Sequence, residues 1–154
     1  MLFRSGAVDA RGWWEAHDRQ KVALGEFLRS SLRRQLGRHG ESPESLRETE
    51  RFFDPGVLTI GFARRFATYK RANLLFADLD RLTRIVADPD RPVQIIFAGK
   101  AHPADRAGQE VIRDIWEKSR SAEFRGRIFV MEDYDMRTAR YLVAGCDEIG
   151  RAHV

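Results

Sequence analysis

The chain has 154 residues, of which 43% are hydrophobic and 32% are charged. This composition is typical of one globular domain with enough apolar side chains for a core, and it excludes a disordered or collagen-like protein. The formal net charge is only +4, since 23 acidic residues offset most of the 27 basic ones. The two kinds of charge are interleaved along the chain. We therefore expect a mixed surface or a site for an anionic ligand rather than a nucleic-acid partner.

No apolar run of about 18 residues is present, and the N-terminus lacks the residue order of a signal peptide. We therefore expect no membrane contact and a cytoplasmic location. The single cysteine, Cys146, has no partner at metal-ligand spacing. It is interpreted as a small core residue, and no metal site is predicted.

Both ends of the chain are expected to be artificial. Residues 149–154 follow neither a helical nor a strand period, and their back-translation resembles a common sequencing adapter. Residues 2–5 can be read in the same way from the opposite adapter. We therefore interpret residues 1–5 and 148–154 as adapter-derived and exclude them from the fold prediction, with a divergent natural terminus as the alternative.

Residues 6–56 are predicted to be a helical lead-in and linker. Between Trp13 and Leu36 the apolar residues recur at the spacing of one helical stripe, which predicts a long amphipathic helix. Residues 37–55 are expected to form a polar loop with a short charged helical piece, before a turn at residues 54–56. The basic face of the long helix is expected to be solvated rather than bound to nucleic acid, and it carries Arg29, Arg33, Arg34 and Arg38.

Residues 57–147 are predicted to form a partial Rossmann-like domain. Three β-rich runs, at residues 57–63, 93–98 and 127–131, are apolar almost throughout, which is typical of parallel strands covered on both faces. Helical patterns occupy residues 69–87, 107–120 and 136–145. This alternation is that of half a doubly wound sheet, so the fold class is α/β with a parallel sheet, preceded by a long helix.

Ligands of such sheets bind at the carboxyl ends of the strands. The first run is followed by RRFATYKR at residues 64–71, which places four cations around the expected start of a helix. A forked guanidinium and a lysine ammonium at this spacing can hold the oxygens of one phosphate. The competing interpretation is a set of surface cations that pair with neighbouring carboxylates such as Asp78 and Asp80.

The other two runs are also followed by polar residues. Gly99 and Lys100 follow the second, with His102 beyond them as either a general acid–base or a structural histidine. The sequence EDYD at residues 132–135 follows the third, and Asp135 is expected to cap the next helix. Neither GxxxxGK[ST] nor GxGxxG occurs, so no P-loop or dinucleotide-binding fingerprint is predicted.

Three blocks of this sequence resemble bacterial α-glucan phosphorylases, the glycogen and maltodextrin enzymes. They are LTIGFARRFATYKR at residues 58–71, IFAGKAHP at 96–103 and EDYDM at 132–136, in matching order and spacing. The resemblance implies that residues 57–147 are part of the C-terminal Rossmann domain of a two-domain glycosyltransferase. Such an enzyme uses inorganic phosphate and pyridoxal phosphate to cleave the terminal α-1,4-glucosidic bond of an α-glucan, giving glucose 1-phosphate.

The same resemblance implies roles for individual residues. Arg65 and Lys70 match the arginine and lysine that hold the substrate phosphate near the cofactor phosphate, with Arg64 in a supporting position. Lys100 and Tyr134 match positions that line or support the cofactor pocket. The lysine that binds pyridoxal phosphate is absent from these 154 residues, so we expect the chain by itself to be inactive.

Two alternatives remain open. One is a nucleotide-sugar-dependent glycosyltransferase of the same architecture, similar to glycogen synthase, in which Arg65 and Lys70 hold a diphosphate. The other is a non-enzymatic basic binding module that uses the arginine-rich helix. Salt-dependent retention on polyanions that Lys70→Ala leaves unchanged would favour this second alternative.

Overall fold

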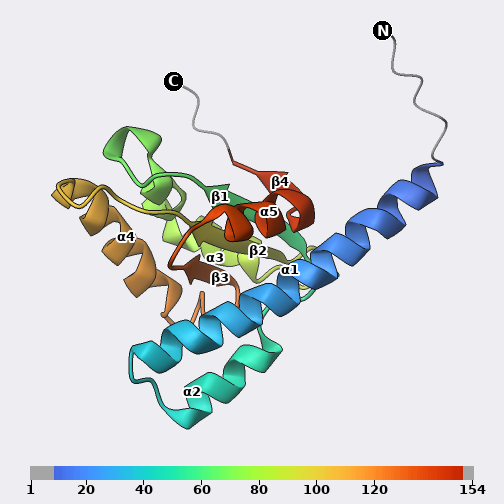
Figure 1. The fold of residues 1–154 in the computed structure, drawn as a ribbon, viewed down its shortest axis with the longest axis horizontal. Coiled ribbons are helices and arrows are strands. Elements are labelled where there is room, and N and C mark those ends of the chain that lie inside the picture. The colour runs from blue at the N-terminus through green and yellow to red at the C-terminus, as the bar shows by residue number, and fades with distance from the viewer. Residues whose placement is uncertain (1–8, 151–154) are drawn as a thin grey trace, which may run out of the picture.

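The computed structural model describes residues 9–150 (Figure 1). Its α-helices are α1 (Ala10–Arg38), α2 (Pro43–Glu48), α3 (Leu79–Val86), α4 (Arg106–Ser119) and α5 (Met136–Gly145). Short 3₁₀ stretches are η1 (Thr49–Arg51), η2 (Thr68–Lys70) and η3 (Ala72–Ala77). The strands are β1 (Leu58–Ala63), β2 (Val93–Ala98), β3 (Ile128–Met131) and β4 (Glu148–Ile149). The first segment interpreted as adapter-derived, residues 1–5, lies outside the described residues.

The strands within residues 9–150 form one parallel sheet, which confirms the predicted α/β class. Their order is β3-β2-β1-β4. The three predicted strands agree with β1, β2 and β3 to within one residue at each end. The long N-terminal helix and the helices at residues 107–120 and 136–145 are confirmed as well.

Apolar side chains cover both faces of the sheet, and β2 shows this most clearly because all six of its residues are buried. Val93, Ile95 and Phe97 belong to the core cluster shared with α3 and α4. Ile96 and Ala98 belong to a second cluster, shared with α1 and α5. Because both faces of such a strand are buried, its sequence is a nearly continuous run of apolar residues.

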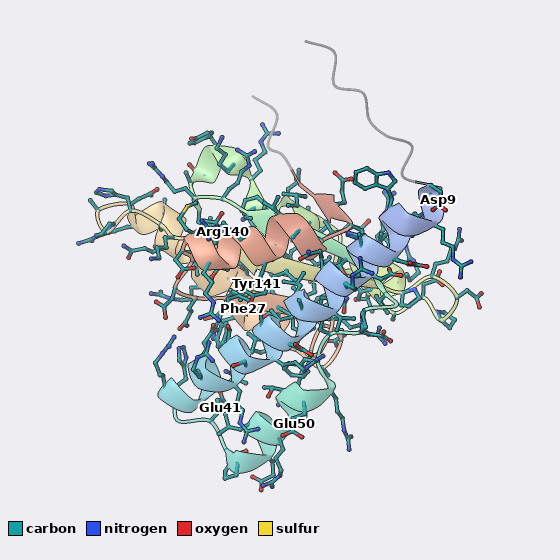
Figure 2. All side chains as sticks on the ribbon, turned by 45° about the vertical axis from the view of Figure 1, so that its right-hand side comes forward. Asp9, Phe27, Glu41, Glu50, Arg140 and Tyr141 are labelled. Carbon is teal, nitrogen blue, oxygen red and sulfur yellow. The ribbon has the colours of Figure 1, made fainter. Side chains whose placement is uncertain are left out.

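Helices α1 and α5 lie side by side on one face of the sheet (Figure 1). Leu24, Leu28 and Leu32 of α1 recur every four residues and are buried in this layer. Between the two helices, Phe27 and Tyr141 stack with ring centroids 4.2 Å apart (Figure 2). Although α1 is 29 residues long, no helix within residues 9–150 is apolar enough over its length to cross a membrane.

The predicted helix at residues 69–87 is wrong in its first half. This stretch contains η2 and η3, and α3 begins only at Leu79. Arg71 separates the two 3₁₀ stretches with a left-handed φ of 49°, which an α-helix cannot contain. Asp78 then starts α3 by accepting a hydrogen bond from the N–H of Arg81 at 2.9 Å. No helix N-terminus therefore follows β1 directly, and attraction for an anion there must come from side chains.

Residues 148–150 continue the sheet even though their side chains show no strand period. Glu148 and Ile149 pair with β1, and the N–H of Gly150 donates to the carbonyl oxygen of Gly61 at 2.8 Å. Strand pairing uses backbone groups that every residue except proline supplies, so this position does not depend on side-chain pattern. The adapter origin of these residues stays a prediction.

A partly buried ionic network joins α1 to Asp147, the residue before β4. The Lys21 ammonium lies 2.5 Å from one carboxylate oxygen of Asp147, and His17 Nε2 lies 2.8 Å from the other. The N–H of Thr59 also donates to Asp147, at 2.7 Å. Burial acts to raise the pKa of Asp147, but the hydrogen bonds from Lys21, His17 and Thr59 outweigh it and hold this pKa below its ordinary value.

Cys146, next to this network, is buried in the cluster beneath α1, as predicted. Burial raises the pKa of its thiol to about 12, so the thiol stays protonated at neutral pH.

Removing the ammonium of Lys21 should destabilise the fold strongly, because the Asp147 carboxylate would stay behind without its buried partner. We expect Lys21→Met to lower the free energy of unfolding by about 3 kcal/mol in urea denaturation. Lys118→Met is the matched control, since its pair with Asp114 is partly exposed, and it should cost less than about 1 kcal/mol. Equal losses in both variants would show that the network of Lys21 contributes no more than a surface pair.

The contribution of Asp147 should depend on pH in one direction. Because its folded pKa is lowered, the stabilisation is complete above the ordinary carboxyl pKa of about 4 and is lost as the pH falls through the lower folded value. We therefore expect the difference in unfolding free energy between wild type and Asp147→Asn to shrink as the pH falls below about 4. Urea titrations at several pH values measure this difference, and a growing difference at acid pH would contradict the assignment.

Candidate functional site at the carboxyl edge of the sheet

Three loops leave the carboxyl ends of neighbouring strands. The first loop (residues 64–71) follows β1, the second loop (residues 99–105) follows β2, and the third loop (residues 132–135) follows β3. Every residue that the sequence proposed for the site lies in one of them. Since the strands are parallel, all three loops lie at the same edge of the sheet.

The strand order reverses between β1 and β4. The connections from β1 to β2 and from β2 to β3 step in one direction, whereas α5 carries the chain back across the sheet to the far side of β1. Helices α3 and α4 accordingly lie on one face and α5 on the other, as right-handed crossovers require. Such a reversal opens a crevice at the carboxyl ends of the strands concerned, and here the first loop borders it.

The first loop is held rigidly against the second. The side chain of Phe66 is buried in the core, and its N–H donates to the carbonyl oxygen of Lys100 at 3.1 Å. The N–H of Arg64 donates to Ala98 at the same distance. The approach is so close that a β-carbon on Gly99 would overlap the carbonyl oxygen of Arg64. Glycine at position 99 is therefore a condition for this loop geometry.

The cations of the first loop are left without acidic partners. Among residues 9–150, neither Arg64, Arg65 nor Lys70 forms an ion pair. Arg65 is exposed, Arg64 and Lys70 are half-buried, and the Lys70 ammonium lies 4.6 Å from the ring centroid of Tyr69. The competing interpretation, in which these cations pair with Asp78, is not supported, because that carboxylate caps α3 instead. Unpaired cations on a rigid loop attract an anion.

A cavity of about 490 Å³ lies beside this loop. Its apolar walls include Phe62 of β1 and Phe97 of β2, and Lys70 and Arg71 bring positive charge to it. Gly150, directly after β4, also lines the cavity, which places it at the reversal of strand order. An apolar cavity with a few convergent polar groups is the usual form of a small-molecule site.

The second and third loops lie close enough for their charges to interact. The pKa of Asp135 is lowered mainly because its carboxylate accepts a hydrogen bond from the N–H of Thr138, with a smaller contribution from the charge of Lys100. Asp135 is thus the helix cap that the sequence predicted. Tyr134 is half-buried and packs on the cluster beneath α1. Within the second loop, His102 Nδ1 accepts a hydrogen bond from the N–H of Ala104, which is a structural role.

Two non-glycine residues of these loops have left-handed backbones. They are Arg71, with φ of 49°, and Asp133, with φ of 55°. Each such residue costs of order 1 kcal/mol, and such strain is concentrated at functional sites. The structure therefore adds Arg71 and Asp133 to the residues that the sequence had singled out.

The arginine side chains of α1 form hydrogen bonds and ion pairs with other groups of this chain. Arg29 donates to two backbone carbonyl oxygens at 3.3 Å, and Arg33 pairs with Glu50 at 3.0 Å. Arg34 donates to two hydroxyl groups of its own helix, and Arg38 pairs with two carboxylates of the third loop. Glu50 is visible below α1 in Figure 2. Of these four arginines, Arg33 and Arg38 are thus paired with carboxylates, whereas Arg29 and Arg34 contact neutral groups and keep their charge.

No protein-family model matches the chain. A maltodextrin phosphorylase of Thermococcus litoralis is 49% identical over 134 residues, and a glycogen phosphorylase of Aquifex aeolicus is 47% identical over 134 residues, each match covering 87% of this chain. A glycogen phosphorylase of Mycobacterium tuberculosis is 40% identical over 91% of the chain. This chain matches a segment of the glycogen and maltodextrin phosphorylase family. It spans only 16–19% of the length of these relatives, and so corresponds to one segment of them.

The glycine at position 99 provides a test of the loop geometry. We expect Gly99→Ala to destabilise the chain by about 1–3 kcal/mol, because the overlapping atom is backbone and cannot rotate away. Gly37→Ala is the matched control: nothing lies within 4 Å of the added carbon, and alanine in α1 should stabilise the helix by up to about 1 kcal/mol. Thermal denaturation measures both, and a Gly99→Ala variant as stable as wild type would exclude the close approach.

Proposed function

We propose that this chain is a segment of an α-glucan phosphorylase and that its first loop binds inorganic phosphate. The parent enzyme transfers the terminal glucosyl unit of an α-1,4-glucan to phosphate and releases glucose 1-phosphate. The observation that carries the proposal is the set of unpaired cations on the first loop, held at the reversal of strand order beside a cavity. The identity of 40–49% with phosphorylases over this same segment supports it.

In this proposal each site residue has a defined role. Arg65 binds two oxygens of the substrate phosphate with its forked guanidinium, and Lys70 neutralises the same group as a point charge. Arg64 adds positive charge beside them. Because the backbone of this loop is held by the contacts at Phe66 and Gly99, these cations stay close to the position of the phosphate and stabilise charge that develops on it during bond cleavage.

The residues also fit a phosphate-bearing cofactor. Pyridoxal phosphate, which the family resemblance implies, would bring a second phosphate group to this site and would assist the reaction through that group. Two phosphates side by side need concentrated positive charge, and Arg64, Arg65 and Lys70, which form no ion pair among residues 9–150, supply it. Lys100 and Tyr134 support the cofactor side of this site. The isolated chain lacks the lysine that binds the cofactor and is expected to be inactive, and a cytoplasmic location stays a prediction.

The test is phosphorolysis by the full-length parent protein. We expect release of glucose 1-phosphate from maltodextrin and inorganic phosphate, dependent on added pyridoxal phosphate. Lys70→Ala should lower the rate about a hundredfold or more, because it removes a preorganised charge. Lys118→Ala, on α4, is the matched control and should leave the rate unchanged.

Three other outcomes would contradict the proposal or favour one of the alternative functions. Glucose transfer from a nucleotide sugar without phosphorolysis would favour a synthase-like transferase. Polyanion binding that Lys70→Ala leaves intact would favour a basic binding module. A Lys70→Ala enzyme as active as wild type would remove the phosphate role from the first loop.

A further inference from the structure

The buried side chain of Gln35 makes two hydrogen bonds to β3. This residue of α1 is only 3% exposed. Its Nε2 donates to the carbonyl oxygen of Val130 at 3.0 Å, and its Oε1 accepts from the N–H of Glu132 at 2.9 Å. Neither backbone group belongs to α1, so the contact joins two segments about 95 positions apart in the chain.

In this contact the side chain of Gln35 makes the hydrogen bonds that a neighbouring parallel strand would make to β3. In the order β3-β2-β1-β4, β3 is an edge strand, and its outer backbone groups have no strand partner within residues 9–150. In a parallel pair, one residue donates to the carbonyl before its partner and accepts from the N–H after it. The amide of Gln35 does both around Met131, and so one side chain replaces one residue of a neighbouring strand.

The last residue of α1 and the residue after it also contact the third loop. Arg38 lies 3.2 Å from the Glu132 carboxylate and 2.9 Å from that of Asp133, and His39 lies 2.8 Å from Glu132. Asp133 has the left-handed backbone, which the loop must adopt immediately after the strand ends. A strained turn persists only where its surroundings over-determine it, and α1 supplies those surroundings.

We infer that Gln35 is a positioning residue of the site, which fixes the end of β3 and thereby the place of Tyr134 at the cofactor side. The role of Tyr134 rests on the proposed function, whereas the contact between α1 and the third loop does not. Through Gln35 and Arg38, a helix that carries no proposed ligand-binding residue sets the geometry of one wall of the site.

The experiment uses the full-length parent protein carrying Gln35→Leu, which keeps the side-chain volume and removes both hydrogen bonds. In hydrogen-exchange mass spectrometry, the peptide that covers residues 132–135 should exchange about tenfold faster or more, while a peptide of β2 is unchanged. In the same variant kcat should fall about tenfold, with KM for phosphate changed less than about twofold, since the first loop is untouched.

Gln20→Leu is the matched control, because it makes the same change at an exposed position of α1 and should alter neither measurement. Arg38→Leu is a second variant that keeps the buried hydrogen bonds, and it should loosen the third loop by a smaller factor. Unchanged exchange of residues 132–135 in Gln35→Leu would overturn the inference, as would a loosened loop with kcat at the wild-type value. If the wild-type parent performs no phosphorolysis, the proposed function fails, while the exchange measurement still decides whether Gln35 holds the loop.

Discussion

A parallel sheet needs apolar cover on both faces, and in this chain one cover comes from outside the alternating strand and helix pattern. Helices α3 and α4 cover one face in the ordinary way. On the other face α5 is too short to cover the sheet alone, and α1 supplies Leu24, Leu28 and Leu32 beside it. Without α1, Ile96 and Phe129 would be open to water. The long helix thus contributes side chains to the core on this face of the sheet.

The site depends on the same arrangement. Reversal of the strand order places the first loop beside a cavity, and the close contact at Gly99 prevents the loop from relaxing toward neighbouring carboxylates. Among residues 9–150, its cations Arg64, Arg65 and Lys70 form no ion pair. Positive charge that is fixed before the ligand arrives stabilises an anion without further ordering, which is the physical basis of the proposed phosphate site.

The helices and strands could largely be predicted from the sequence, because the pattern of apolar residues along the chain indicates which side chains are buried. β2 and β3 are buried throughout and β1 is buried in part, and the apolar character of the runs at residues 57–63, 93–98 and 127–131 alone located these three strands. The three loops that carry Arg65, Lys70, Lys100 and Tyr134 followed from the rule that ligands bind at carboxyl ends. Their roles toward a ligand stay predictions.

The parts that the sequence did not show depend on tertiary contacts. The helical pattern after residue 69 is interrupted by the left-handed Arg71, and an arginine gives no local sign of that conformation. Gln35 was overlooked for a related reason, because a glutamine on a helix is normally exposed and its two partners lie about 95 positions away. Reading only local patterns, one cannot distinguish a surface amide from one that completes a sheet.

The position of α1 also bears on how the domain is made. During synthesis α1 emerges before its partners β3 and Asp147, which follow roughly 95 and 126 residues later. Until then the leucine stripe and the amide of Gln35 have no native surface to bind. Until β3 and Asp147 have been made, the amphipathic face of α1 therefore lacks these partners, and this delay creates a period in which chaperone binding or association between nascent chains competes with folding.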